Sequence, residues 1–227
     1  DMAVRGKLVP QDPEDEPAEK LLQNIIEEKK SLIKEKIVKK SKFMGKPLDL
    51  EPFELPASWE WARLDDVTFL ITDGEHATPP RVNQSAIPLG TAKNIRDGFL
   101  DLDRTDYVLP EVAEKCWNRC KPKHNDLLMV CVGATTGRLC LVKNPPDFVI
   151  VRSVALIRPF PKYIYPEYLE LAVRTPCLQE QIWSSVKRSA QPCLYINRMQ
   201  QLVIPLPPLA EQKRIVAKVD ELMALCD

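Results

Sequence analysis

The sequence of 227 residues lacks the features of a membrane-spanning or secreted protein. No stretch reaches the roughly 18 apolar residues of a membrane span, and the best candidate, residues 127–134, has only the length of a strand. The first seven residues lack the apolar core of a secretory signal. We therefore expect a soluble, cytoplasmic protein without membrane association.

Histidine is scarce and cysteine is scattered, which argues against a metal site. The chain has two His and seven Cys, and it contains no Cys-x-x-Cys pair. Structural zinc is held by such ligands at short spacings, and Cys116 with Cys120 is the nearest approach to a ligand pair. We expect no metal ion, and reduced, mostly buried thiols instead.

Glycine is also rare, with 7 residues, whereas 21 residues are proline. Proline thus makes up about 9% of the chain, against a usual share of ~5%. Because proline fixes the backbone angle φ, prolines that cluster at the joints between segments indicate rigid connections.

The sequence also lacks the motifs of common catalytic sites. It contains neither Gly-x-Ser-x-Gly nor His-Glu-x-x-His, and no paired carboxylates in a catalytic context. The glycines of Gly133-Ala-Thr-Thr-Gly137 lack the spacing and the lysine of a phosphate loop, and they join two predicted strands. Asn144-Pro-Pro-Asp147 has Asp where an adenine methyltransferase has the aromatic that stacks on the flipped base, so a turn is favoured.

The net charge of zero conceals an asymmetry along the chain. Residues 51–114 contain five Lys and Arg against thirteen Asp and Glu, and residues 115–198 contain thirteen against five. Such a distribution permits a basic face for a polyanion on a neutral protein. If the two halves interleave in space, their charges cancel instead.

Hydrophobic patterning divides the chain into three parts. We expect an N-terminal arm, amphipathic helix and linker over residues 1–56, a compact α/β (α+β) domain over residues 57–205, and the start of a second helix over residues 206–227. The compact part has the pattern of a small, mixed and mostly antiparallel sheet with short helices. Its predicted strands are 67–71 (or the end of a short helix), 87–89, 126–132, 139–142 and 149–158, and its predicted helices are 166–174 and 177–185, with a short helix and strand over 196–204.

The flanking helices resemble coiled-coil segments. After a polar, extended arm over residues 1–16, the first helix is expected to begin at Pro17, and its apolar pairs between Leu21 and Val38 form one stripe. In the second helix, apolar residues recur at spacings of four, three and four, as in a heptad seam. Both stripes predict packing against this chain or against a partner helix. The seam residues are Ile215, Val219, Leu222 and Cys226.

Five segments together resemble the specificity subunit of type I restriction-modification systems. Residues 3–13 and Glu54-Leu-Pro-Ala-Ser-Trp-Glu-Trp61 resemble the lead-in to a target recognition domain. Asp73-Gly-Glu-His76 resembles its early loop, with Glu75 where Thr is usual, and residues 126–142 resemble its glycine-containing hairpin. The most specific match is Ile204-Pro-Leu-Pro-Pro-Leu-Ala-Glu-Gln-Lys-Arg-Ile215, which leads into the family's conserved spacer helix.

The resemblance implies DNA recognition without catalysis. Subunits of this family carry two target recognition domains separated by antiparallel helices, and each domain reads half of a split target in double-stranded DNA. They direct methyltransferase subunits, which use S-adenosylmethionine, and ATP-driven restriction subunits that need Mg²⁺, so no cofactor is expected in this chain. With one recognition domain, we expect a fragment of a two-domain subunit or a half-length form that self-associates.

Polar and basic side chains in four segments are the candidates for DNA contact. Lys and Arg suit phosphates, while Thr, Gln and Asn suit base edges. For the residues around 187–191, a solvated helix end is the alternative interpretation, and for His76 it is a contact within its own loop. The candidates are Asp73, Glu75, His76, Thr78 and Arg81; Lys93, Asn94 and Arg96; Thr135, Thr136 and Arg138; and Lys187, Arg188, Gln191 and Tyr195.

Two other functions remain open at this point. A protein-interaction scaffold would use the two helical stripes and would have no affinity for duplex DNA. An adenine methyltransferase fragment would bind S-adenosylmethionine.

Overall fold

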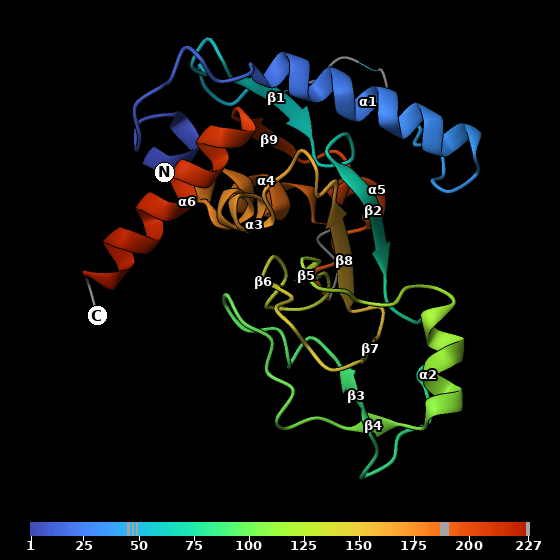
Figure 1. The fold of residues 1–227 in the computed structure, drawn as a ribbon. Helices are drawn as coiled ribbons and strands as arrows, with labels where there is room; N and C mark the ends of the chain where they lie inside the picture. The colour runs from blue at the N-terminus through green and yellow to red at the C-terminus, as the bar shows by residue number, and fades with distance from the viewer. Residues whose placement is uncertain (45, 47, 49, 187–190, 226–227) are drawn as a thin grey trace. The chain divides into compact units, whose positions relative to one another are not determined.

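The computed structural model describes residues 1–44, 46, 48, 50–186 and 191–225. The chain forms two compact units, each built from segments that are distant in sequence (Figure 1). Unit 1 comprises residues 1–69, 159–181 and 199–227, and unit 2 comprises residues 70–158 and 182–198. These units differ from the expected division at residues 56 and 205, because parts of the expected α/β domain pack with both ends of the chain.

Unit 1 contains the two long helices and one antiparallel strand pair. Strand β1 pairs with β9, so that Glu60 lies opposite Leu206 and Arg63 opposite Val203. Helix α4 (Pro176–Ser185) begins in unit 1 and ends in unit 2, and α5 (Ile196–Met199) leads back. The other elements of unit 1 are α1 (Ala18–Lys34), β1 (Glu60–Arg63), α3 (Pro166–Arg174), β9 (Val203–Leu206) and α6 (Leu209–Ala224).

The prediction of an extended arm over residues 1–16 was wrong for its first part. Met2–Arg5 form a 3-10 turn, and Ala3 and Val4 are buried. They pack in one cluster with Trp59, Tyr168 and residues of α6, because these apolar side chains together exclude water from the centre of unit 1.

Helix α1 buries the expected apolar stripe, and it also buries one charged residue that was not expected there. Leu21 and Ile25 are buried, and Lys29, one turn further along, is only 3% exposed. The Lys29 ammonium binds the backbone carbonyl of Asp65 and lies 3.4 Å from the Asp65 carboxylate. A buried charge needs such partners, so this pair holds α1 in register on unit 1. The helix ends earlier than expected, because Lys36 has a left-handed φ of 62°.

Two buried polar side chains fix the start of α6. The Glu211 carboxylate accepts hydrogen bonds from Trp59 Nε1 and Gln11 Nε2, both at 2.8 Å. The Gln212 amide accepts one from the backbone N–H of Tyr165 at 2.8 Å and donates to the carbonyl of Pro207 at 3.0 Å. Glu211 and Gln212 lie in the segment 204–215 that resembles the entry to the spacer helix, and they thus join three distant parts of unit 1.

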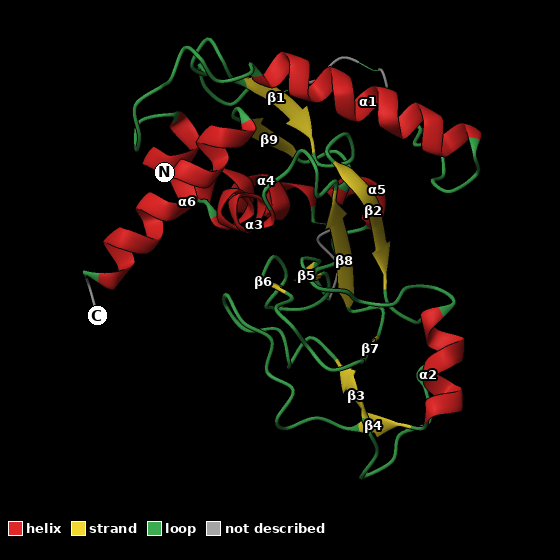
Figure 2. Ribbon diagram, viewed as in Figure 1, coloured by secondary structure: helices red, strands yellow, loops and turns green. Residues whose placement is uncertain are grey.

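Unit 2 is built on small sheets connected by long loops (Figure 2). One sheet has the order β2-β8-β5-β6, and the second has the order β4-β3-β7. The expected hairpin is confirmed as the antiparallel pair β5–β6, whereas β3 and β7 are parallel. The strands are β2 (Thr68–Asp73), β3 (Ile87–Gly90), β4 (Tyr107–Val108), β5 (Leu127–Val130), β6 (Leu139–Leu141), β7 (Val149–Ile150) and β8 (Val154–Pro159).

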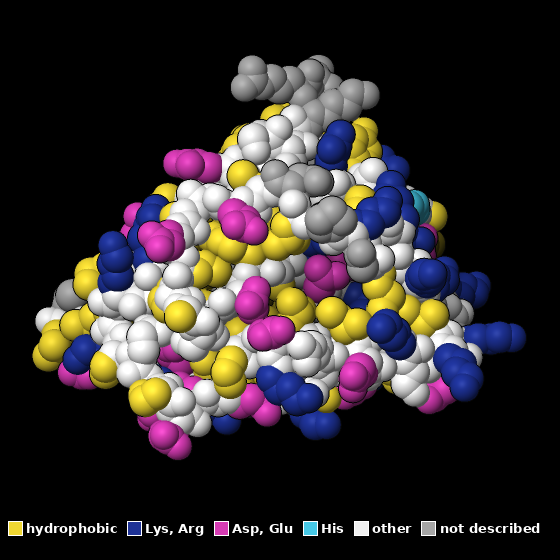
Figure 3. All heavy atoms as spheres, turned by 90° about the horizontal axis from the view of Figure 1, so that it is seen from above, with side chains coloured by type: hydrophobic (Ala, Val, Ile, Leu, Met, Phe, Trp, Pro, Cys, Tyr) yellow, Lys and Arg dark blue, Asp and Glu magenta, His cyan; other side chains and the backbone are white. Residues whose placement is uncertain are grey.

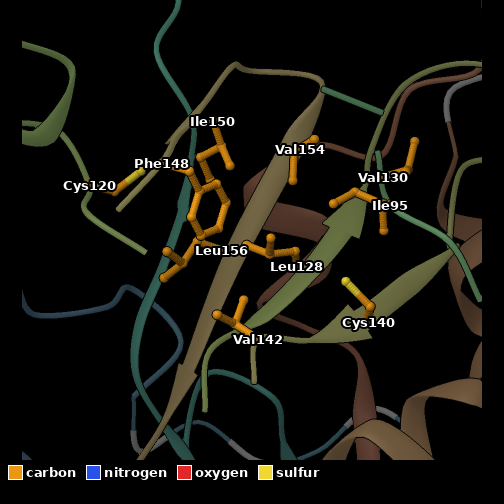
Figure 4. Packing of buried hydrophobic residues seen from close by; sticks show 10 residues of the cluster. All are labelled: Ile95, Cys120, Leu128, Val130, Cys140, Val142, Phe148, Ile150, Val154 and Leu156. Carbon is orange, nitrogen blue, oxygen red and sulfur yellow. The ribbon is translucent and has the colours of Figure 1, made fainter. Parts of the chain in front are cut away.

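The core of unit 2 lies where these strands meet. Figure 4 shows Leu128 of β5 and Leu156 of β8 together with Phe148 and Ile95, all nearly inaccessible to solvent. The thiol of Cys120 belongs to this cluster, and burial raises its pKa to about 12. Four of the six described cysteines are buried, as the expectation of mostly buried thiols required.

The mixed, mostly antiparallel architecture was predicted correctly, but several elements differ. The expected strand 149–158 is interrupted, because residues 151–153 turn between β7 and β8. Helix α2 (Pro110–Trp117) was missed, although Pro110 stands at its favoured first position. Asn144 lies in the loop between β6 and β7 with a φ of 44°, as the turn interpretation required. No described helix has the length and apolar character needed to span a membrane.

The contacts of Glu211 predict a measurable loss of stability when the carboxylate is removed. Glu211→Ala should lower the free energy of unfolding by about 2 kcal/mol, because the Trp59 indole N–H would stay buried without its partner. Glu211→Gln should cost no more than about 1 kcal/mol, since the amide oxygen still accepts a hydrogen bond. Urea unfolding followed by circular dichroism measures both, and equal losses would contradict this account.

The same side chain also predicts a pH dependence. Burial raises the pKa of Glu211 above its ordinary 4.5, so the folded state binds this proton more tightly than the unfolded chain does. The contribution of Glu211 to the free energy of unfolding should therefore fall as the pH rises from 4.5 through the raised pKa. Glu211→Gln should abolish that part of the pH profile.

Candidate functional site

Backbone contacts bring the first candidate loop against the turn between β7 and β8. The N–H of Gly74 donates to the carbonyl of Val154 at 3.0 Å, and that of Glu75 donates to Ile150 at 2.9 Å. A Cβ atom on Gly74 would lie only 2.4 Å from the carbonyl oxygen of Ile150. Residue 74 must therefore be glycine for the loop to pass this closely.

The same turn connects the other candidate segments. The N–H of Val151 donates to Gly90 at 3.3 Å, which brings residues 91–96 alongside. The N–H of Cys131 donates to Ser153 at 2.8 Å, and the N–H of Gly133 donates to Pro192 at 2.9 Å. Residues 150–154 thus bind the backbone at three of the candidate segments. Residues 192–194 join them indirectly, through residues 131–133.

A polar cleft of about 600 Å³ in unit 2 is lined by Arg81, residues 91–94, residues 104–106 and the turn between β7 and β8. Three cations from three parts of the chain line it, namely Arg81, Lys93 and Arg104. The guanidinium of Arg81 is held by the carboxylate of Asp106 at 2.6 Å. Asp106, Asn94 and three hydroxyl groups complete the polar lining. With three cations against one carboxylate, the cleft can accept both an anion and a hydrogen-bonding edge. These hydroxyls belong to Thr91, Thr105 and Ser153.

Sequence reasoning missed Arg104 and the three hydroxyl residues. Arg104 stands in the acidic run Asp101-Leu-Asp-Arg-Thr-Asp106, where its neighbours conceal it in any count of local charge. Ser153 lies within a segment that was predicted to be continuous strand. Only the turn at 151–153 exposes it to the cleft, and no pattern of residues signalled that turn.

Folding redistributes the charge asymmetry of the sequence. Unit 2 contains 15 Lys and Arg against 10 Asp and Glu, whereas unit 1 contains 17 against 22. The acidic segment 51–114 is divided between the units, so the positive excess falls on the unit that contains the cleft. Acidic and basic side chains are interspersed on the face drawn in Figure 3.

In the first loop, Asp73 is held from two sides. Its carboxylate lies 2.8 Å from His76 Nε2 and accepts a hydrogen bond from the guanidinium of Arg119, which also donates to the Asp73 carbonyl at 3.1 Å. Burial alone would raise the pKa of Asp73, but the bonds from Arg119 and His76 outweigh it and lower the pKa. Asp73 and Arg119 therefore position the loop.

Two candidates are committed to holding the backbone. The Asn94 side chain is 4% exposed, and its amide accepts hydrogen bonds from the N–H and hydroxyl of Thr91 and donates to Asp101. The Thr136 hydroxyl is buried and donates to Gly133 at 2.7 Å across the β5–β6 turn. Neither side chain is available to a ligand in this conformation, so we assign both of them to shaping the loops.

The remaining described candidates are accessible, in differing degrees. Asp73, Glu75, Thr135 and Arg138 are partly buried. Lys187 and Arg188 lie outside the described residues. The exposed candidates are His76, Thr78, Arg81, Lys93, Arg96, Gln191 and Tyr195.

Comparison with protein families identifies what the chain resembles. Residues 88–227 match the model of the type I restriction modification DNA specificity domain. Over the whole chain, the sequence is 29% identical to the specificity subunit of the type I restriction enzyme EcoAI and 30% identical to that of EcoEI, both from Escherichia coli. The chain spans about two fifths of the length of these relatives, 38% in each case.

Solved structures share the fold. One chain, from a structure concerned with complex assembly and conformational transition of the type I R-M system, superposes with a TM-score of 0.59 and is 20% identical. The HsdS subunit from Thermoanaerobacter tengcongensis superposes with a TM-score of 0.56 and is 19% identical. Both matches cover 92% of this chain, and they cover 47% and 46% of the other chain.

Removing the Arg119 guanidinium should release the first loop. In Arg119→Gln, the pKa of Asp73 should rise, because the carboxylate loses the stronger of its two partners. The amides of residues 74–78 should exchange faster with solvent. Carboxyl titration by NMR and hydrogen exchange measure the two effects.

Lys121→Gln provides the matched control for this experiment. Lys121 follows α2 as Arg119 does, but its ammonium binds the carboxylate of Asp147 at 2.7 Å instead. The Lys121→Gln variant should leave the pKa of Asp73 unchanged.

In the wild type, the ion pair between Asp73 and Arg119 should persist at neutral pH. It should be lost as the pH falls through the lowered pKa of Asp73. An unchanged pKa in Arg119→Gln would contradict the positioning role.

Proposed function

Since the chain belongs to the family of type I restriction modification DNA specificity domains, we propose that it recognises a DNA sequence without performing chemistry on it. The observation that carries the proposal is the polar cleft of unit 2, where cations from three segments and three hydroxyl groups line one cavity. A net positive unit with mixed cations and hydroxyls suits a ligand that has both phosphates and base edges.

We assign different tasks to the two kinds of side chain. Lys93, Arg104 and Arg81 set the position of the duplex by binding phosphates, which carry no sequence information. Ser153 and the exposed Gln191 offer donors and acceptors to the base edges, which do carry it. The Thr91 hydroxyl donates to Asn94 and offers an acceptor only. Target recognition then belongs to unit 2 rather than to the whole of residues 57–205.

The wider role follows the relatives, which are named as subunits of type I restriction enzymes. We infer that this chain directs methyltransferase and restriction subunits to one half of a split DNA target in the cytoplasm, with S-adenosylmethionine, ATP and Mg²⁺ bound by those partners. The end of α6 suits association through its helices, because Leu222, Met223 and Leu225 are exposed there. Either a second recognition domain or a second copy can supply the other half-site.

Selection of bound duplexes from a random library, at two salt concentrations, tests sequence recognition. We expect one short motif to be enriched at both concentrations, because base contacts depend less on salt than phosphate contacts do. Uniform binding that disappears at the higher salt would show that this chain holds phosphates only. Absence of binding at both concentrations would favour the scaffold, for which the exposed end of α6 is the supporting observation.

Charge removal in the cleft should weaken binding to all sequences alike. The double variant Lys93→Ala, Arg104→Ala should lower the slope of log affinity against log salt by about 2, since each lost phosphate contact contributes ~0.9. Fluorescence anisotropy at a series of salt concentrations measures the slope.

The control also removes two positive charges, at the end of the β5–β6 hairpin that is opposite its turn. Lys123 and Lys143 are exposed beside the residues where that hairpin begins and ends, away from its turn at 133–138. Lys123→Ala with Lys143→Ala should leave the slope within about 0.5 of the wild type. Equal effects of the two pairs would contradict binding at the cleft.

A further inference from the structure

Phe99 is the most exposed aromatic side chain among the described residues, at 58%. Its neighbours in sequence behave differently, because Ile95 is fully buried in the core of unit 2 and Leu100 packs against that core. The fold therefore uses the residues on both sides of the turn and leaves this ring in water. Because more than half of its surface is exposed, Phe99 contributes less to folding than its buried neighbours do, and its exposed part is accessible to a partner.

The backbone under Phe99 is held rigidly. Ile95 and Leu100 form an antiparallel bridge, and the N–H of Arg96 donates to the carbonyl of Phe99 at 3.0 Å. Gly98 supplies the left-handed φ of 87° that the turn requires, and its N–H donates to Leu139 at 3.2 Å. The ring therefore projects from a fixed support beside the start of β6.

Cations flank this turn. Arg96 Nε lies 3.6 Å from a carboxylate oxygen of Asp101, and Arg138 Nε lies 3.9 Å from one of Asp97. Both guanidinium groups are partly accessible, at 46% and 30% of their side-chain surface. Long ion pairs of this kind at the surface are weak, so a phosphate can compete for either arginine.

The surroundings of the ring favour nucleic acid over protein as its partner. A protein interface presents a contiguous apolar patch with few charges at its centre. Here, a single apolar ring stands among arginines and aspartates. An apolar side chain that stands among cations on a rigid turn is instead the arrangement with which proteins wedge open a base step.

We propose that Phe99 inserts between neighbouring base pairs of the duplex that unit 2 binds, and kinks the DNA there. Arg96 and Arg138 then bind the phosphates on either side of the opened step. The unit would discriminate sequences partly by how easily that step unstacks, at a position where no hydrogen bond reads the bases. This inference rests on the proposed function of unit 2 in binding duplex DNA.

The test uses the duplex selected from the random library, labelled at both ends for energy transfer. A second set of duplexes contains 2-aminopurine at successive positions. With the wild-type chain, the ends should approach each other, and the fluorescence of one 2-aminopurine should rise as its stacking is lost. Phe99→Ala should lose both signals and bind the selected sequence roughly ten-fold more weakly, whereas Phe99→Leu should retain the kink, because leucine also serves as a wedge.

Leu109→Ala is the matched control, because Leu109 is another exposed apolar side chain of unit 2, at 42%. It should leave both signals at wild-type values, and thermal unfolding should show all variants folded.

Each other outcome is decisive. If Phe99→Ala binds its motif and bends the DNA as the wild type does, the wedge is excluded while sequence recognition stands. Straight DNA in the wild-type complex, together with a loss of binding to methyltransferase subunits in Phe99→Ala, would make the ring a protein contact. If the wild type binds no duplex at all, the proposed function and the wedge both fail.

Discussion

The close passage of the backbone at Gly74 over Ile150 is the constraint on which the candidate site depends. Where the oxygen of Ile150 would lie 2.4 Å from a Cβ atom, only glycine allows the first loop to lie on the turn between β7 and β8. The turn between β7 and β8 also contacts Gly90 and Cys131 through backbone hydrogen bonds. Loops of very different sequence position are therefore held by one short stretch of main chain, and the side chains they carry remain free to differ.

Polar side chains in this protein fall into two groups with different tasks. Asn94, Thr136, Glu211 and Gln212 are buried, and their hydrogen bonds hold loops or helix ends in place. Among the described residues, no buried side-chain nitrogen or oxygen lacks a partner. Because an unpaired buried polar group is costly, such residues are committed to the fold. Lys93 and Arg104 are exposed, so the fold does not require their charges to be paired, and we assign ligand binding to them.

The two units also differ in electrostatic character. The positive excess lies on unit 2, and the helices with their apolar stripes belong to unit 1. This division agrees with our proposal that unit 2 contacts a polyanion while the helices of unit 1 provide a surface for association. The chain passes between the units several times, so each unit depends on segments from distant parts of the sequence.

The sequence by itself determined the helices with strong periodicity, the β5–β6 hairpin and the family, because these depend on neighbouring residues or on local motifs. Pro166–Arg174 was predicted to the residue, since a proline begins this amphipathic helix. Only the tertiary structure decided the two units, the burial of Ala3 and Lys29, and the break in the strand at 151–153, because these depend on contacts between distant segments. The same holds for the candidate site. Residue chemistry singled out Arg81 and Lys93, which line the cleft. Whether a polar residue of that lining is exposed, as Arg104 is, or is buried and braces a loop, as Asn94 is, is set by the packing around it.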